Sequence, residues 1–220
     1  MNSEELAHFK IKNREFVSKF KFESEKFSRN DIFISKSSSD INSAIETILK
    51  NNKTPIIIRS KNNILPKSEV LKIFDSKKTR EIDFRHYYLR MREKTNNQPV
   101  LEEISKIVQE CIVKGITLLI NFDDCCIKYE ELFDPDINEF YAPNLFSPLI
   151  FTQKDFGLPK NINEHFRGKN LTYDKNFRFI LYSKFVVDLS LDDSYLIKVF
   201  ENRFEKALPI RKICFIVISK

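Results

Sequence analysis

The residues with the clearest capacity for chemistry are two acids at the end of an apolar segment. Leu118 to Phe122 is apolar except for Asn121, and Asp123 and Asp124 follow it directly. In P-loop ATPases such a strand carries one carboxylate to a magnesium ion and a second to the attacking water, because the strand ends where the phosphates are bound. Acids also begin ordinary loops after strands, so the spacing leaves both interpretations open.

The segment that would hold the phosphates has the expected length but lacks glycine. Arg59 to Ser68 follows an apolar run and contains Lys61, Lys67 and Ser68, whose side chains could contact a nucleotide. Backbone N–H groups must wrap closely around phosphates, which glycine allows and Pro66 hinders. The three glycines of the chain lie elsewhere, at Gly115, Gly157 and Gly168. We therefore predict no catalytic residue and no cofactor, with ATP or ADP and Mg²⁺ as the alternative.

Other catalytic and metal chemistries have no matching pattern. The three histidines lie far apart in the sequence and suggest no Ser/His/Asp or Cys/His arrangement. The four cysteines fall in or beside apolar segments, without CxxC spacing or a neighbouring histidine. We predict no metal site, and we predict buried, reduced thiols at Cys111, Cys125, Cys126 and Cys214.

The charge of the chain raises the question of an acidic partner. A net charge of +6 favours nucleic acid, anionic lipid or an acidic protein surface, but the basic residues are scattered. His86 to Arg92 interleaves aromatic residues with arginines, as proteins that bind single-stranded nucleic acid do. A helix or strand with one solvated face has the same pattern, so nucleic-acid binding is a third alternative rather than the preferred one.

The elements that must position these residues alternate along the chain. Short apolar runs predict strands at residues 55–59, 80–85, 116–122, 177–182 and 213–218. Helical spacing of apolar residues predicts helices at 41–49, with Asp40 as the cap, and at 67–75, 101–113 and 194–205. This alternation predicts an α/β fold with a mostly parallel, five-stranded sheet flanked by helices.

One α/β domain is predicted over residues 40–220, after an N-terminal extension at 1–39. Prolines interrupt an irregular insertion at about 134–174, whose aromatic residues form a candidate interface: Phe140, Tyr141, Phe146, Phe151 and Phe156. The longest apolar runs are too short to span a bilayer, and the acidic start has no signal-peptide pattern. We therefore expect a cytoplasmic protein that does not associate with membranes.

Taken in order, these pieces resemble the fifth AAA module of dynein heavy chains. That family has a degenerate phosphate loop, a helix that ends in an Ala-Ile-hydrophobic-hydrophobic-Gly motif, a Walker-B-like strand that ends in acids, an Asp-Pro pair and a Tyr-x-x-x-Phe-Arg strand followed by Thr-Lys. The corresponding segments here are Pro55-Ile56-Ile57-Ile58, Glu110 to Leu119, Asp123-Asp124, Asp134-Pro135, Tyr173 to Lys184 and Arg211 to Ile216.

The resemblance implies an AAA+ P-loop-like core with the AAA+ sheet order and without the C-terminal helical lid. It assigns Asp123 and Asp124 to the Walker-B position and Ser183 to the sensor strand. In dyneins this module serves as a structural element of the ring. The resemblance therefore implies a non-catalytic module that binds another protein, such as tubulin or an axonemal or dynein component, in a cilium or flagellum. The opposing hypothesis is a nucleotide-binding switch or weak ATPase with an atypical phosphate loop.

Overall fold

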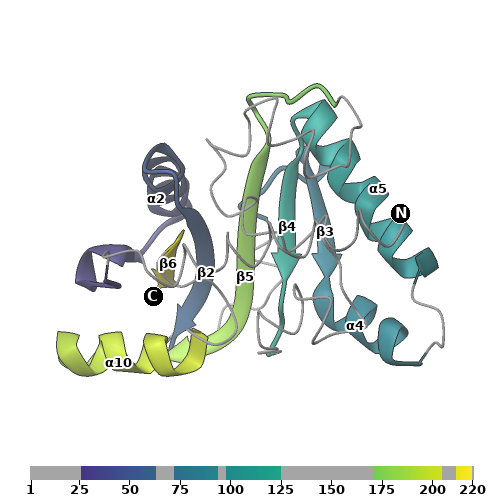
Figure 1. Cartoon of the computed structure of the whole chain (residues 1–220). Coiled ribbons are helices and arrows are strands. Elements are labelled where there is room, and N and C mark those ends of the chain that lie inside the picture. Colours follow the sequence, from purple (N-terminus) through teal and green to yellow (C-terminus); the bar gives the residue numbers. More distant parts are fainter. Residues whose placement is uncertain (1–25, 63–71, 94–97, 125–170, 205–211, 220) are drawn as a thin grey trace.

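All described strands belong to one parallel sheet. The computed structural model describes residues 26–62, 72–93, 98–124, 171–204 and 212–219. The strands pair in the order β1-β6-β2-β5-β4-β3 (Figure 1). Because every pair is parallel, the carboxyl ends of all the strands lie along the same edge of the sheet, the lower one in Figure 1. The strand bounds are β1 Ile32–Ser35, β2 Thr54–Ser60, β3 Thr79–Asp83, β4 Thr117–Asn121, β5 Arg178–Val187 and β6 Ile213–Ile218.

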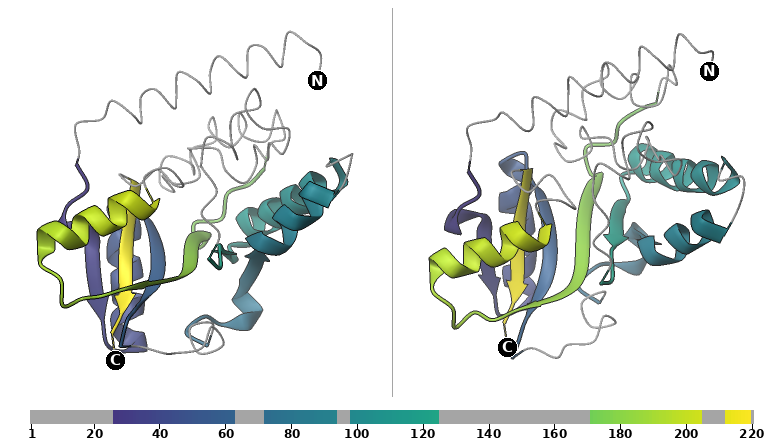
Figure 2. Two further views of the ribbon diagram at one scale, coloured as in Figure 1. Left: turned by 90° about the horizontal axis from the view of Figure 1, so that it is seen from below. Right: turned by 60° about the horizontal axis from the view of Figure 1, so that its bottom comes forward.

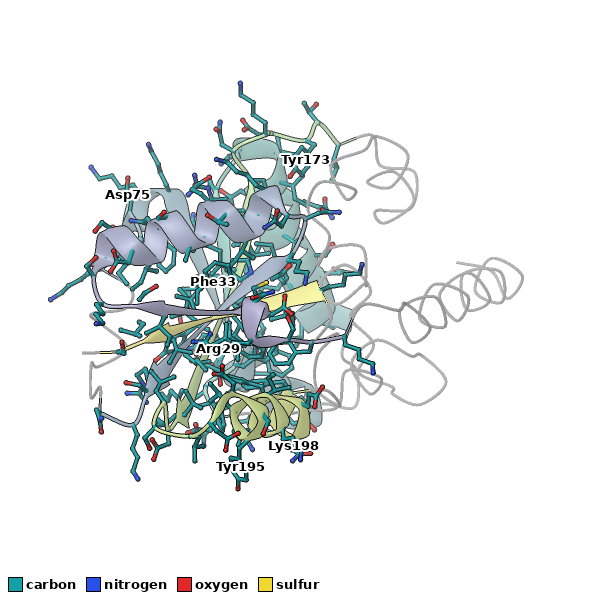
Figure 3. All side chains as sticks on the ribbon, turned by 90° about the vertical axis from the view of Figure 1, so that its left-hand side faces the viewer. Arg29, Phe33, Asp75, Tyr173, Tyr195 and Lys198 are labelled. Atoms are coloured by element: carbon teal, nitrogen blue, oxygen red, sulfur yellow. The ribbon has the colours of Figure 1, made fainter. Side chains whose placement is uncertain are left out.

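Within the described part of the chain, four α-helices flank the sheet. They are α2 Ser38–Lys50, α4 Phe84–Glu93, α5 Gln98–Lys114 and α10 Asp193–Phe204, and the single turns η1 Arg29–Asp31 and η2 Ser76–Lys78 precede β1 and β3. Seen from its β1 edge, the sheet has α2 on one face and α10 on the other (Figure 3). The view from below shows α4 and α5 beside the β3 end of the sheet (Figure 2). None of the described helices has the length and apolar composition needed to cross a membrane.

Two cores fill the space between the sheet and these helices. Alternate strand residues point to opposite faces, so Leu118 and Ile120 join the larger core with α4, α5 and α10. Leu119, between them, joins the smaller core under α2. Where both faces are covered, as in β4 and β6, the strands are apolar along nearly their whole length, as parallel strands in α/β proteins are. The edge strand β3 buries only Ile82.

The expected α/β fold with a parallel sheet is confirmed, but the count of five strands is wrong. The sixth strand is β1, which lies within residues 1–39 and, among the described strands, pairs with β6 alone. It has four residues, too few for a clear pattern of alternation. Its pairing partners lie about 180 residues further along the chain, so nothing local in the sequence indicates it.

Several predicted boundaries also change, and the strand predicted at 177–182 runs on to Val187 as β5. The N-cap of α2 is Ser37 rather than Asp40: the Asp40 N–H donates to Ser37 Oγ (3.1 Å), and the Ser37 N–H donates to Asp40 Oδ2 (3.0 Å). This reciprocal capping box places the acid three residues inside the helix. The strand predicted at 80–85 ends at Asp83, and its last two residues begin α4. The helix predicted at 67–75 and the insertion at 134–174 lie largely outside the described residues.

The two described cysteines are buried and free, as predicted, whereas Cys125 and Cys126 lie outside the described residues. Burial raises the pKa of Cys111 to about 12. Burial, reinforced by the neighbouring Asp31 carboxylate, likewise raises the pKa of Cys214 to about 12. Both groups are therefore protonated thiols near neutral pH, which makes them poor nucleophiles and poor metal ligands.

Alkaline pH is expected to destabilise the fold through these thiols. Their pKa is raised in the folded state, so the stabilisation is complete below about pH 9 and is lost as the pH rises toward 12. The free energy of unfolding should fall by up to about 1.4 kcal/mol per pH unit for each thiol. Urea unfolding at neutral and alkaline pH measures the loss. The Cys111→Ala/Cys214→Ala variant should lose less stability over the same interval, and an equal loss would contradict the prediction.

Candidate functional site

The candidate site lies at the carboxyl ends of β3, β4 and β5. Asn121 is paired with Asp83 of β3 and with Tyr182 of β5. Two residues after this pair, just past the end of β4, Asp123 lies level with Lys184 of β5. The Lys184 N–H donates to the Asp123 carbonyl (2.8 Å). The parallel register therefore places an acid and a lysine next to each other although they are 61 positions apart.

A local irregularity in β5 shapes this edge. The pairing of β2 with β5 goes from Ile57 with Tyr182 to Arg59 with Val186, so β5 carries two extra residues at this point. The extra length falls on Ser183 to Phe185, at the carboxyl edge. Bulges often re-aim side chains next to functional sites. Here the Ser183 hydroxyl donates to the Asp123 carbonyl (3.2 Å).

The Asp123 carboxylate is held between two cations. Its Oδ1 lies 2.5 Å from Lys184 Nζ and its Oδ2 lies 3.5 Å from Arg85 Nη1, while its side chain is 13% exposed. Burial by itself would raise the pKa of Asp123. The hydrogen bonds and charges of Lys184 and Arg85 outweigh burial and hold that pKa below its usual value. The carboxylate is thus ionised and neutralised from within the chain.

The backbone around Asp123 is fixed by a further set of contacts. Asp123 has φ +53°, in the left-handed region that few residues other than glycine adopt. Its N–H donates to Asn121 Oδ1 (3.0 Å), and the Asn121 amide donates in turn to Glu81 Oε1 of β3 (2.9 Å). These contacts, with those from β5, over-determine a conformation that would otherwise be unfavourable.

Of the predicted nucleotide contacts, the structure brings together Asp123 and Ser183. Asp124 is exposed beside them, and its carbonyl accepts from Arg203 Nη2 (3.3 Å). Lys61 is directed elsewhere and pairs with Asp188 (3.3 Å). Lys67, Ser68 and the five aromatic residues of the candidate interface lie outside the described residues.

A separate hollow opens at the carboxyl ends of β1, β2 and β6. It measures about 540 Å³ and its lining includes Ser60, Lys61, Leu189, Ser190 and Ser219. Ser60 is 4% exposed, and its hydroxyl has no hydrogen-bond partner in the described part of the chain. Ligands of parallel α/β sheets bind outside the carboxyl ends of the strands, so this hollow is the place where a small ligand would enter.

Tyr87, Tyr88 and Arg90 of α4 contact other parts of the fold. The Tyr87 hydroxyl donates to Glu103 Oε1 of α5 (2.8 Å), and Arg90 Nη2 donates to the other carboxylate oxygen (2.8 Å). Burial, followed by the Glu103 hydrogen bond, raises the pKa of Tyr87 to about 12. Tyr88 packs against the larger core. Two residues of the segment His86 to Arg92, Tyr87 and Arg90, thus join α4 to α5.

The sequence did not indicate the residues that complete the Asp123 network. Lys184 was part of the segment compared with the dynein family, but nothing in its neighbourhood showed that it would meet Asp123. Arg85, Asn121 and Glu81 belong to three different elements, and only the register of β3 with β4 brings them to this edge. Ser60 reads as the last residue of an ordinary strand.

The chain was compared with models of known families, with curated proteins and with solved structures. No family model matches it, and no curated protein or solved structure matches it either.

Proposed function

We propose that this chain is a non-catalytic AAA-like module, related to those of dynein heavy chains, that acts as a structural component by binding another protein. The observation that carries the proposal is the strand order. Counted from β2, the strands β6-β2-β5-β4-β3 lie in the order 5-1-4-3-2. AAA+ cores have this order, which the resemblance of the sequence motifs implied. The strand order therefore supports the AAA-like core, and the relation to dynein heavy chains rests on the order of the motifs.

The contacts of the motif residues support a structural rather than a catalytic role. In the segment Tyr173 to Lys184, Phe177 is buried in the core and packs edge-on against Tyr173, with 6.0 Å between ring centroids. Arg178 pairs with Glu46 of α2 (2.5 Å), so the start of β5 is joined to the helix that covers this face of the sheet. These interactions hold the segment against the core and against α2.

The electrostatics at the Walker-B-like position support the same conclusion. A catalytic acid there must face a metal ion or a water molecule. Asp123 instead faces Lys184 and Arg85, and Ser183 donates its hydroxyl to the backbone of Asp123. Two of the three side chains that the resemblance assigns to the Walker-B position and the sensor strand, those of Asp123 and Ser183, thus help to hold β4 and β5 together.

Calorimetric titration with ATP and ADP in the presence of magnesium tests the proposal. We expect no heat of binding and no change in the thermal midpoint of the full chain. Binding tighter than about 100 μM, which corresponds to roughly 5.5 kcal/mol, together with a raised midpoint, would contradict the non-catalytic assignment. Co-sedimentation with microtubules then tests whether tubulin is the partner. If the protein does not sediment with microtubules, dynein and axonemal components are tested next.

A nucleotide-binding switch is the second candidate, and the hollow beside β2 favours it. Ser60 brings a buried hydroxyl without a partner in the described residues, and Lys61 brings an exposed cation whose partner is Asp188. The Asp124→Asn variant separates the two functions, because the switch requires this acid and the structural module does not. Unchanged partner binding supports the structural module. Joint loss of partner binding and of nucleotide affinity supports the switch.

A further inference from the structure

We propose that Lys184 is a tethered cation that takes the place of a divalent metal ion at the Asp123 edge and fixes this edge in one arrangement without any ligand. The inference rests on the proposed function for one point only, the equivalence of Asp123 with a Walker-B acid. It goes further because it names the group that makes the module independent of metal and nucleotide.

Magnesium does not fit the Asp123 carboxylate as it stands. The ion binds through one or two carboxylates and keeps several waters, so it needs a carboxylate that faces open space. Both oxygens of Asp123 already face a cation, Lys184 at 2.5 Å and Arg85 at 3.5 Å.

Lys184 contacts Asp123 twice and thereby joins several strands. Its N–H donates to the Asp123 carbonyl (2.8 Å) and its ammonium group lies 2.5 Å from the carboxylate. Its own carbonyl accepts from Arg59 Nη2 of β2 (3.4 Å). Arg85 adds a contact from α4 to the same carboxylate. One residue of β5 therefore links the ends of β2 and β4, as a bound ion with several ligands would.

The tether determines how this edge responds to its surroundings. A free ion occupies its site only at sufficient concentration, whereas a covalently attached ammonium group is always present. The arrangement of β2, β4, β5 and α4 at this edge therefore does not depend on metal or nucleotide. A protein partner that contacts this edge should bind equally well with and without Mg²⁺.

The Lys184→Met variant of the full chain tests the inference. It keeps a side chain of similar length and leaves Asp123 with only the more distant Arg85. Its thermal midpoint should fall by at least about 4 °C. About 10 mM magnesium chloride should recover part of the loss, and sodium chloride of equal ionic strength should not. The wild-type midpoint should be unaffected by magnesium.

Two further proteins distinguish a tethered cation from general packing. Asp123→Asn/Lys184→Met removes both charges, so it should be more stable than Lys184→Met and should not respond to magnesium. Lys114→Met breaks an exposed pair with Glu110 (2.9 Å) and should leave the midpoint unchanged. A wild-type protein stabilised by magnesium would overturn the inference. So would a Lys184→Met variant that is as stable as the wild type or that does not respond to magnesium. The nucleotide titration and the partner assays judge the proposed function separately.

Discussion

Replacing Phe200 by alanine is expected to lower the free energy of unfolding by about 3–5 kcal/mol. Phe200 lies on the inner face of α10, is fully buried, and its ring centroid is 4.3 Å from that of Phe215 in β6. Three further rings surround it at centroid distances of 6.0 to 6.4 Å, those of Phe27, Phe185 and Phe204. The variant loses buried apolar area and ring contacts and leaves a cavity that the neighbouring rings cannot close.

Urea unfolding measures the effect of Phe200→Ala as a lower midpoint at an unchanged slope. The matched control is Tyr195→Ala on the same helix, where the side chain is 54% exposed and the change should stay within about 0.5 kcal/mol. A loss of several kcal/mol is a large fraction of the stability of a typical domain. Equal midpoints for the two variants would mean that α10 does not pack on β6 as described.

Replacing Gly115 by alanine is expected to lower the free energy of unfolding by about 2–4 kcal/mol. Gly115 follows the last residue of α5 with φ +63°, and the Ile116 N–H donates to the Cys111 carbonyl (2.9 Å), as in a Schellman motif. A β-carbon at this position would lie 2.6 Å from Asp174 Oδ1 and 3.1 Å from the β-carbon of Asn176. The variant therefore meets both backbone strain and a steric clash.

The steric part of the Gly115 effect can be measured separately. In an Asp174→Gly background the clash with the carboxylate is removed, so the cost of Gly115→Ala should shrink toward the backbone strain alone. Lys114→Ala, one residue earlier and exposed, is the control and should change stability by no more than about 0.5 kcal/mol. If Gly115→Ala and Lys114→Ala unfold at the same urea concentration, the left-handed cap is not required.

The sequence predicted those elements whose signals are local. Ile213 to Ile218 is a continuous apolar run and forms β6 with these bounds, because a strand covered on both faces needs apolar residues at every position. The regular spacing of Ile104, Ile107, Val108 and Cys111 predicted α5. The edge strand β1 and the helix α4 escaped prediction. Four residues are too few to show a period, and the residues of α4 have the mixed apolar and charged pattern that either a helix or a strand can carry.

The candidate site was predicted in part for the same reason. Asp123 is visible in the sequence, since it follows a strong apolar strand. The ammonium of Lys184 is not visible as its partner, because it meets Asp123 only through the register of β4 with β5 and the extra residues of β5. Local sequence reports the conformation of a segment and says little about the distant segment it pairs with.

The sequence by itself determined the α/β class, the positions of most strands and helices, and the acids at the end of β4. These features follow from hydrophobic periodicity and from the residues that begin and end helices, both of which act over a few residues. Only the tertiary structure decided that β1 joins the sheet and that Lys184 and Arg85 neutralise Asp123. It also decided that Tyr87 and Arg90 bind Glu103 rather than facing solvent. Each of these outcomes brings together residues from separate elements, and their mutual positions follow from strand register and packing rather than from local sequence.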